Sequence, residues 1–207
     1  MARPPPSGLV PPLDEDARRI SLSETYAAAP DPRRLNVFAY GSLIWSPCFN
    51  VVDRRAAVLR DFRRDCSIWS VLARGTPDRP GLGFALEASA GAACHGVLYR
   101  LPDTTTQADL VPLWEREMWT DAYSPQWVEV SAEGAEEPAL TFVLRPDHPQ
   151  YAGGLSIAEK AGYIERAHGK YGPCRDMVLQ TAAALRDLGI SDPDLEALAA
   201  ALTTPPG

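Results

Sequence analysis

The order of strand-like and helical hydrophobic patterns constrains the fold of this chain most. Strand-like patterns cover residues 36–45, 54–71, 80–89 and 93–102, the second of them long enough for one or two strands. A helical pattern then follows over 104–122, and after it comes a predicted hairpin with its turn at Glu133 and Gly134. From Ser156 onward the spacing is helical. Strands and helices that do not alternate regularly favour an α+β fold over a doubly wound parallel sheet.

The first 34 residues predict a tail that precedes the folded domain. Residues 1–14 are rich in proline, which favours an extended or disordered chain. A short helix is expected over 13–29, with Ser21 or Ser23 as its cap. We therefore expect a single domain over residues 35–203.

Glycine and proline punctuate the helical C-terminal part. The first helix there is expected to end at Gly169 or Gly172, and the second is followed by Gly189, a residue suited to the C′ position. Asp192 is the expected N-cap of a last short helix, with Pro193 at its first position.

Charge and apolar content restrict the partners of the chain. It carries 20 basic and 27 acidic residues, a formal net charge of −7, which argues against nucleic acid because phosphate backbones need basic clusters. No apolar run approaches the roughly 20 residues of a membrane span, and the N-terminus lacks an apolar signal core. We expect a cytoplasmic protein, a monomer or homodimer, without a nucleic-acid or membrane partner.

The cysteines predict free, mostly buried thiols in a reducing compartment. They are far apart, form no C-x-x-C pair, and complete no zinc-ligand spacing with the three histidines. A metal site or a nucleophilic Cys–His pair is the alternative. Cys94 and His95 are adjacent in a predicted strand, so their side chains point to opposite faces, which counts against a catalytic pair. The four cysteines are Cys48, Cys66, Cys94 and Cys174.

A sharp bend after the first predicted strand is the first candidate site. Tyr40, Gly41, Ser42 and Leu43 follow an apolar strand and precede a second apolar run. The glycine lets backbone N–H groups approach a ligand closely, and Ser42 adds a hydroxyl. The alternative is a connection between strands that binds nothing.

The eight-residue loop R-G-T-P-D-R-P-G at 74–81 is the second candidate. It combines the cation of Arg74 with Gly75, Thr76 and two prolines that stiffen the loop. It could form a second wall of a pocket that faces the bend, or it could be an ordinary surface loop.

Glu117 is the candidate acid or base. Trp114 and Met118 are four residues apart and mark the apolar stripe of a predicted helix, and Glu117 lies at the margin of that stripe. Partial burial there raises the pKa of a carboxyl toward the range of a useful general base. The alternative is a solvated charge, which fits the neighbouring Glu115 and Arg116.

Five segments, in order, resemble the ChaC family of γ-glutamylcyclotransferases. The resemblance runs from about residue 37 to residue 188. The segments are Y-G-S-L at 40–43, R-G-T-P-D-R-P-G at 74–81, G-V-L-Y-R-L at 96–101, R-E at 116–117 and G-K-Y-G at 169–172. The residues after Glu117 are similar to the bacterial branch, with R-E-M in place of the R-E-K-G-G-Y of eukaryotic glutathione-degrading members. Ala73 stands where the family often has histidine.

The resemblance implies a γ-glutamylcyclotransferase-like fold, a small mixed β-barrel flanked by helices. It implies that Glu117 is the catalytic acid/base and that Tyr40, Gly41, Ser42, Leu43, Arg74, Gly75 and Thr76 bind substrate, with Tyr151 at an aromatic position of the pocket. The implied reaction cyclises the γ-glutamyl group of glutathione to 5-oxoproline and releases Cys-Gly, without a metal or other cofactor. The departures of this sequence from the family pattern leave open the same reaction on other γ-glutamyl amino acids or γ-glutamylamines. A non-catalytic ligand-binding or regulatory module is a separate alternative.

Overall fold

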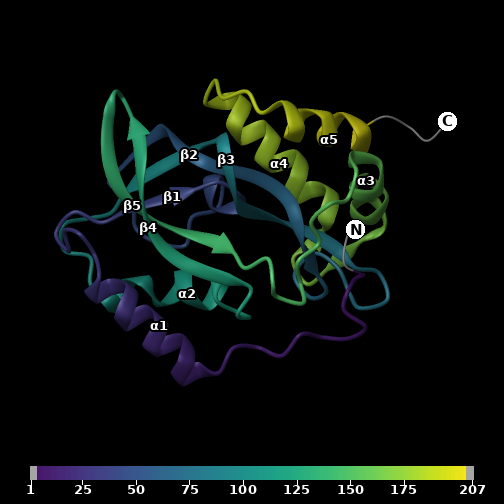
Figure 1. Ribbon diagram of the computed structural model, residues 1–207, viewed down its shortest axis with the longest axis horizontal. Helices are drawn as coiled ribbons and strands as arrows, with labels where there is room; N and C mark the ends of the chain where they lie inside the picture. Colours follow the sequence, from purple (N-terminus) through teal and green to yellow (C-terminus); the bar gives the residue numbers. More distant parts are fainter. Residues whose placement is uncertain (1–3, 204–207) are drawn as a thin grey trace.

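Five strands close into a barrel at the centre of the molecule (Figure 1). The computed structural model describes residues 4–203. Around the barrel the strands follow the order β1-β3-β2-β4-β5, and β1 pairs in parallel with β5 at Val37 and Leu140 to close it. Their bounds are β1 Asn36–Ala39, β2 Asp53–Ser70, β3 Gly81–Arg100, β4 Tyr123–Ala132 and β5 Ala135–Leu144. The predicted α+β class and small mixed barrel are confirmed.

Helices flank the barrel on two sides (Figure 1). Three C-terminal helices, α3, α4 and α5, lie together on one side, and α1 and α2 lie on the other. The helices are α1 Glu15–Ala27, α2 Val111–Glu117, α3 Ile157–Arg166, α4 Cys174–Asp187 and α5 Pro193–Thr203. Short 3₁₀ turns η1 Ser42–Ile44 and η2 Gln107–Leu110 and a two-residue hairpin, β6 His168–Gly169 with β7 Gly172–Pro173, complete the described elements.

The strand patterns at 80–89 and 93–102 belong to one strand, β3, so their separation in the prediction is wrong. The small residues between them do not break the strand because β2 pairs with it on both sides of an irregularity. At that point Asp61 has a positive φ of 61° and accepts a hydrogen bond from the N–H of Gly91, 2.8 Å away. A bulge of this kind bends a long strand pair without ending it, as barrel closure requires.

Three predicted helix ends differ from the structure. Asp14, rather than Ser21 or Ser23, caps α1 through its carboxylate. The central helix is shorter than the predicted 104–122: residues 107–110 form the 3₁₀ turn η2, and α2 covers only Val111–Glu117. The helix α3 ends at Arg166, before the predicted glycines, because the chain turns into the β6–β7 hairpin. The predicted hairpin turn at 133–134 and Asp192 as the cap of α5 are confirmed.

Helix α1 packs on the barrel domain although it lies in the predicted tail. Leu22 is buried in the core, the indole N–H of Trp114 donates to the Ser21 hydroxyl at 3.2 Å, and that of Trp127 donates to the Thr25 carbonyl at 2.9 Å. The domain start at residue 35 stays a prediction, and the first three residues of the predicted tail lie outside the described residues.

The thiols and the apolar stripe are where the sequence predicts them. All four cysteines are free, with Cys48 half-buried and the other three buried. Trp114 and Met118 are each 1% exposed. Within residues 4–203, none of the helices has the length and apolar character that a bilayer crossing requires.

A buried ion pair ties the last helix to the bend. Arg64, 7% exposed, forms an ion pair with Asp192 and donates to the carbonyl oxygens of Tyr40 at 2.8 Å and His95 at 3.0 Å. One guanidinium therefore fixes the end of β1, the strand β3 and the start of α5 together.

We expect Asp192→Asn to lower the free energy of unfolding by about 3 kcal/mol, because it leaves the buried Arg64 charge without its partner. Asparagine caps helices about as well as aspartate, so the substitution isolates the ion pair from the cap. Chemical denaturation of both proteins measures the difference. A loss below about 1 kcal/mol, the size of an exposed pair, would show that the contact adds little.

Candidate active site

A cavity of about 780 Å³ opens beside the barrel between the bend and the end of α2. This volume lies within the range of small-molecule sites. Six of the residues predicted from the sequence border it: Tyr40, Gly41, Ser42, Leu43, Arg74 and Glu117. The barrel fold therefore brings together residues that lie up to 77 positions apart, from position 40 to position 117.

Glu117 is the last residue of α2 and its side chain is 16% exposed. Burial raises the pKa of its carboxyl, and the positive charge of Arg116 partly opposes that rise. The distance from the Arg116 Nε to the Glu117 Oε1 is 3.4 Å. A carboxyl with a raised pKa inside a cavity is suited to exchange a proton near neutral pH.

Residues Ser42–Ile44 of the bend form one 3₁₀ turn, η1. The N–H groups at its start have no hydrogen-bond partner within the turn. Groups from three other elements fix it. The Tyr99 hydroxyl donates to the Ile44 carbonyl at 2.6 Å, and the Trp45 indole donates to the Thr181 hydroxyl at 3.0 Å. Arg64 holds the carbonyl that precedes the turn. Since Ser42 and Leu43 border the cavity, a turn held this way keeps their amides beside it in a fixed position.

Arg116 joins the bend to the carboxyl, a role that the sequence interpretation missed. Its guanidinium donates to the Ser42 hydroxyl at 2.7 Å and to the Ser46 carbonyl at 2.6 Å, while its Nε faces Glu117. Its side chain is 29% exposed, so the interpretation as a solvated charge is wrong, whereas Glu115 is exposed as expected. The adjacent R-E pair was the available signal.

Two tyrosines lie beside Glu117, Tyr40 buried and Tyr123 half-buried. The Tyr40 hydroxyl donates to the Phe142 carbonyl and the Tyr123 hydroxyl to the Phe84 carbonyl, each at 2.8 Å. Burial is the main cause of a raised pKa in both phenols, and the nearby Glu117 charge adds to the rise. Both hydroxyls therefore remain protonated donors and cannot serve as bases at neutral pH.

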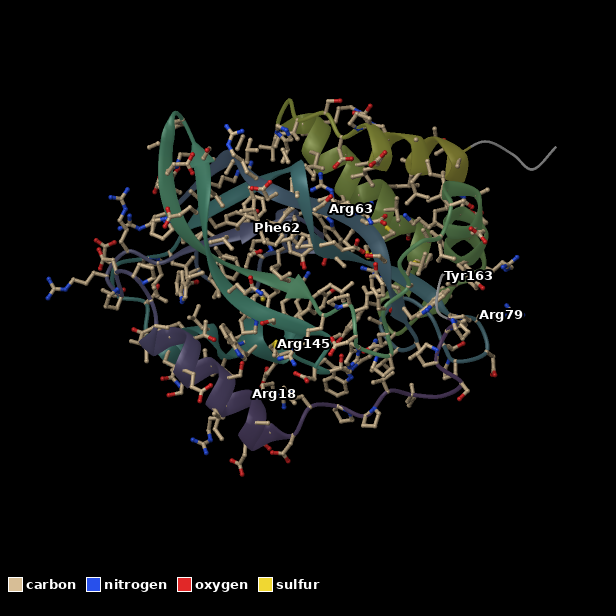
Figure 2. All side chains as sticks on the ribbon, in the orientation of Figure 1. Arg18, Phe62, Arg63, Arg79, Arg145 and Tyr163 are labelled. Atoms are coloured by element: carbon tan, nitrogen blue, oxygen red, sulfur yellow. The ribbon has the colours of Figure 1, made fainter. Side chains whose placement is uncertain are left out.

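The 74–81 loop contributes one residue to the cavity. Arg74 borders it, and its Nη1 donates to the Tyr171 carbonyl at 2.6 Å. Gly75 and Thr76 do not border it: Thr76 closes a tight turn with Arg79. Figure 2 shows Arg79 at the outer edge of the molecule.

Tyr151 does not border the cavity either. Its ring packs beside Gly153, and the preceding residue, Gln150, borders the cavity instead. The Gln150 amide donates to the Trp69 carbonyl at 2.9 Å and accepts from the Thr120 hydroxyl at 2.7 Å.

Gly75 is expected to matter for stability. A Cβ added there would stand 2.3 Å from the Gly81 amide nitrogen and 2.5 Å from the Ser70 carbonyl oxygen, both backbone atoms that cannot rotate away. We expect Gly75→Ala to cost about 3 kcal/mol of unfolding free energy through overpacking, measured by thermal or chemical denaturation. Gly134→Ala, with open space around its Cβ but a φ of 84°, is the comparison, and a smaller loss at Gly75 than at Gly134 would contradict the clash.

Together these features define a barrel protein with an acid/base site built around Glu117, the less exposed of the two carboxyls that border the cavity. The pKa of the nearby Cys48 thiol is raised by burial, which makes it a poor nucleophile. Glu117 is therefore the group in the described cavity best suited to accept a proton.

Comparison with known proteins assigns the family. The sequence model of the family described as ChaC-like protein matches residues 35–204. This chain belongs to the ChaC-like protein family.

The relatives carry related names. The chain is 32% identical over 184 residues to the glutathione-specific γ-glutamylcyclotransferase of Escherichia coli K12, covering 88% of this chain and 79% of that protein. It is 32% identical over 172 residues to γ-glutamylcyclotransferase 2-3 of Arabidopsis thaliana, covering 79% of this chain and 85% of that protein. The crystal structure of a glutathione-specific γ-glutamyl cyclotransferase from yeast shares the fold, with a TM-score of 0.75 at 21% identity over 82% of this chain and 95% of that one.

Proposed function

We propose that this protein is a γ-glutamylcyclotransferase that converts glutathione into 5-oxoproline and Cys-Gly. The observation that carries the proposal is the largely buried Glu117 carboxyl, with its raised pKa, in the cavity that the 40–43 bend borders. The glutathione-specific relative from Escherichia coli supports the choice of substrate.

The reaction needs one proton acceptor. The α-ammonium of the γ-glutamyl group loses a proton to the Glu117 carboxylate, and the free amine attacks the γ-carbonyl carbon of the same residue. A C–N bond forms to close the five-membered ring, and the amide C–N bond to cysteine breaks. Two protons in all leave the attacking nitrogen, the second after the new C–N bond has formed. Both pass in turn through Glu117 to the departing nitrogen, which leaves as an ammonium, so the carboxylate is regenerated and no water is consumed.

The other site residues hold the γ-glutamyl group of the substrate in position for ring closure. The amides at Ser42 and Leu43 are placed to stabilise negative charge on the substrate, either the developing charge on the γ-carbonyl oxygen or the fixed charge of the α-carboxylate. Arg74, whose pKa burial lowers but which stays charged, adds a cation to the cavity. Because attack is intramolecular, holding the γ-glutamyl chain folded supplies much of the rate enhancement.

The proposal includes the setting of the reaction. We place the protein in the cytoplasm, as a monomer or homodimer with a small-molecule substrate and no nucleic-acid partner. The formal net charge of −7 supports the last point.

The test is incubation of the purified protein with glutathione and detection of 5-oxoproline and Cys-Gly by mass spectrometry. γ-Glutamyl-alanine and γ-glutamyl-methylamide, assayed in parallel, distinguish a glutathione enzyme from one that cyclises other γ-glutamyl compounds. Absence of 5-oxoproline from all three would contradict the proposed reaction and favour a binding module.

A further inference from the structure

A segment outside the family match borders the cavity. Leu9, Val10, Pro11 and Pro12 belong to the proline-rich N-terminal part, whereas the family model begins at residue 35. We call residues 9–13 the strap. In Figure 1 the chain that precedes α1 runs beneath the barrel, from the start of α1 toward the side that carries α3.

The strap is fixed at its C-terminal end. The N–H of Leu13 donates to the Trp119 carbonyl at 2.8 Å, two residues beyond Glu117, and Asp14 caps α1. Since α1 is itself bound to the barrel domain through Ser21, the last residue of the strap is held at a fixed point beside the end of α2.

The composition of the strap suits a stationary wall. Pro11 and Pro12 have fixed φ angles and no N–H, so the segment loses little conformational entropy when it is ordered and cannot add a strand to the sheet. Leu9 is 64% exposed, and Trp119, Leu72 and Tyr171 are other exposed apolar residues that border the same cavity.

The strap lines the cavity and does not fill it. The volume of about 780 Å³ remains with the strap in place, enough for a tripeptide-sized ligand. An inhibitory segment would occupy the space beside Glu117 and the bend, which here is open.

We propose that the strap is the outer wall of the substrate site and contacts the leaving group, selecting γ-glutamyl peptides over smaller γ-glutamyl compounds. This inference rests on the proposed function. Glu117 and the 40–43 bend contact the γ-glutamyl part of the substrate, so the wall made by residues 9–12 contacts atoms beyond the scissile amide. Lys170, which also borders the cavity, adds a cation for a peptide carboxylate.

The experiment uses the full chain with Pro11→Gly/Pro12→Gly, which loosens the strap without altering its length. Glycine has more conformations to lose than proline when the strap is ordered, so we expect KM for glutathione to rise about tenfold. The kcat should stay within twofold, and KM for γ-glutamyl-methylamide, whose leaving group is one methylamine, should not change. Pro4→Gly/Pro5→Gly is the matched control, because these prolines do not border the cavity.

Binding provides a readout independent of turnover. In a Glu117→Gln background, calorimetry should show the same tenfold weakening of glutathione binding when the strap prolines are replaced. Thermal denaturation checks that each variant is folded. In the same Glu117→Gln background, Val10→Asp adds a carboxylate to the strap and should also weaken the binding of anionic glutathione.

The two proposals fail in different ways. An unsubstituted protein that releases no 5-oxoproline from glutathione overturns the reaction. An active protein whose Pro11→Gly/Pro12→Gly variant keeps its KM, changes KM equally for both substrates, or gains kcat/KM overturns the strap as a selective wall.

Discussion

Glu117→Gln is expected to lower kcat for 5-oxoproline formation by about 10³-fold while the protein stays folded, because glutamine keeps the shape of the side chain but cannot accept the proton. Steady-state assays with glutathione measure the loss. Glu165→Gln, an exposed residue of α3, is the matched control and should stay within twofold of the unsubstituted protein. Turnover that survives at Glu117→Gln would overturn the mechanism.

The same carboxyl sets the pH dependence. Burial raises the pKa of Glu117 above its ordinary value near 4.5, and only the ionised form can act as the base. We therefore expect kcat/KM to fall as pH drops through this raised pKa, in an acid limb that lies above the limb of an ordinary glutamate.

The raised pKa also predicts a gain in stability for Glu117→Gln. In the folded state Glu117 holds its proton to higher pH than in the unfolded state, so the folded state binds more protons between the two pKa values. Stability from this group is fully present below its ordinary, unfolded-state pKa and is lost as pH rises through the folded pKa. The melting temperature of Glu117→Gln should therefore exceed that of the unsubstituted protein at neutral pH and equal it at pH 3. A lower melting temperature at pH 7 would show that the carboxylate is better solvated than its position suggests.

Arg116→Met is expected to lower kcat by about 10²-fold, since it removes charge-assisted hydrogen bonds worth about 1.5–3 kcal/mol each. The variant loses the two bonds to Ser42 and Ser46 and the charge that faces Glu117. The distinctive readout is the pH profile. Arg116 lowers the pKa of Glu117, so its removal should move the acid limb to higher pH.

Two further variants separate the contributions of Arg116. Arg116→Lys retains a charge but not the planar fork, so it should lose activity with a smaller shift of the acid limb. Ser42→Ala removes one acceptor and should leave the limb in place. An acid limb that stays fixed in Arg116→Met would show that Arg116 does not act through Glu117.

Much of the fold and the principal site residues followed from local patterns. The apolar stripe of Trp114 and Met118, the hairpin turn at 133–134 and the cap at Asp192 depend on neighbours a few residues away, and each appears in the structure. The errors arose where distant partners decide. Strand β3 continues through its small residues only because β2 lies alongside. Helix α3 ends early because the β6–β7 hairpin packs on the 72–75 loop. There Gly169 lies so close to the backbone of Ala73 and Gly75 that a Cβ would not fit.

The sequence alone was enough for the class of fold, the family and the choice of Glu117 as the candidate acid/base, because residue type, spacing and motif order carry that information. The tertiary structure decided which residues share the cavity. In the structure Arg116 is not a surface charge but connects the bend to the Glu117 carboxyl. Gly75, Thr76 and Tyr151 do not border the cavity, whereas the proline-rich strap does. The physical reason is that these contacts join positions far apart in the chain, and only closure of the barrel sets their distances and the burial that raises the pKa of Glu117.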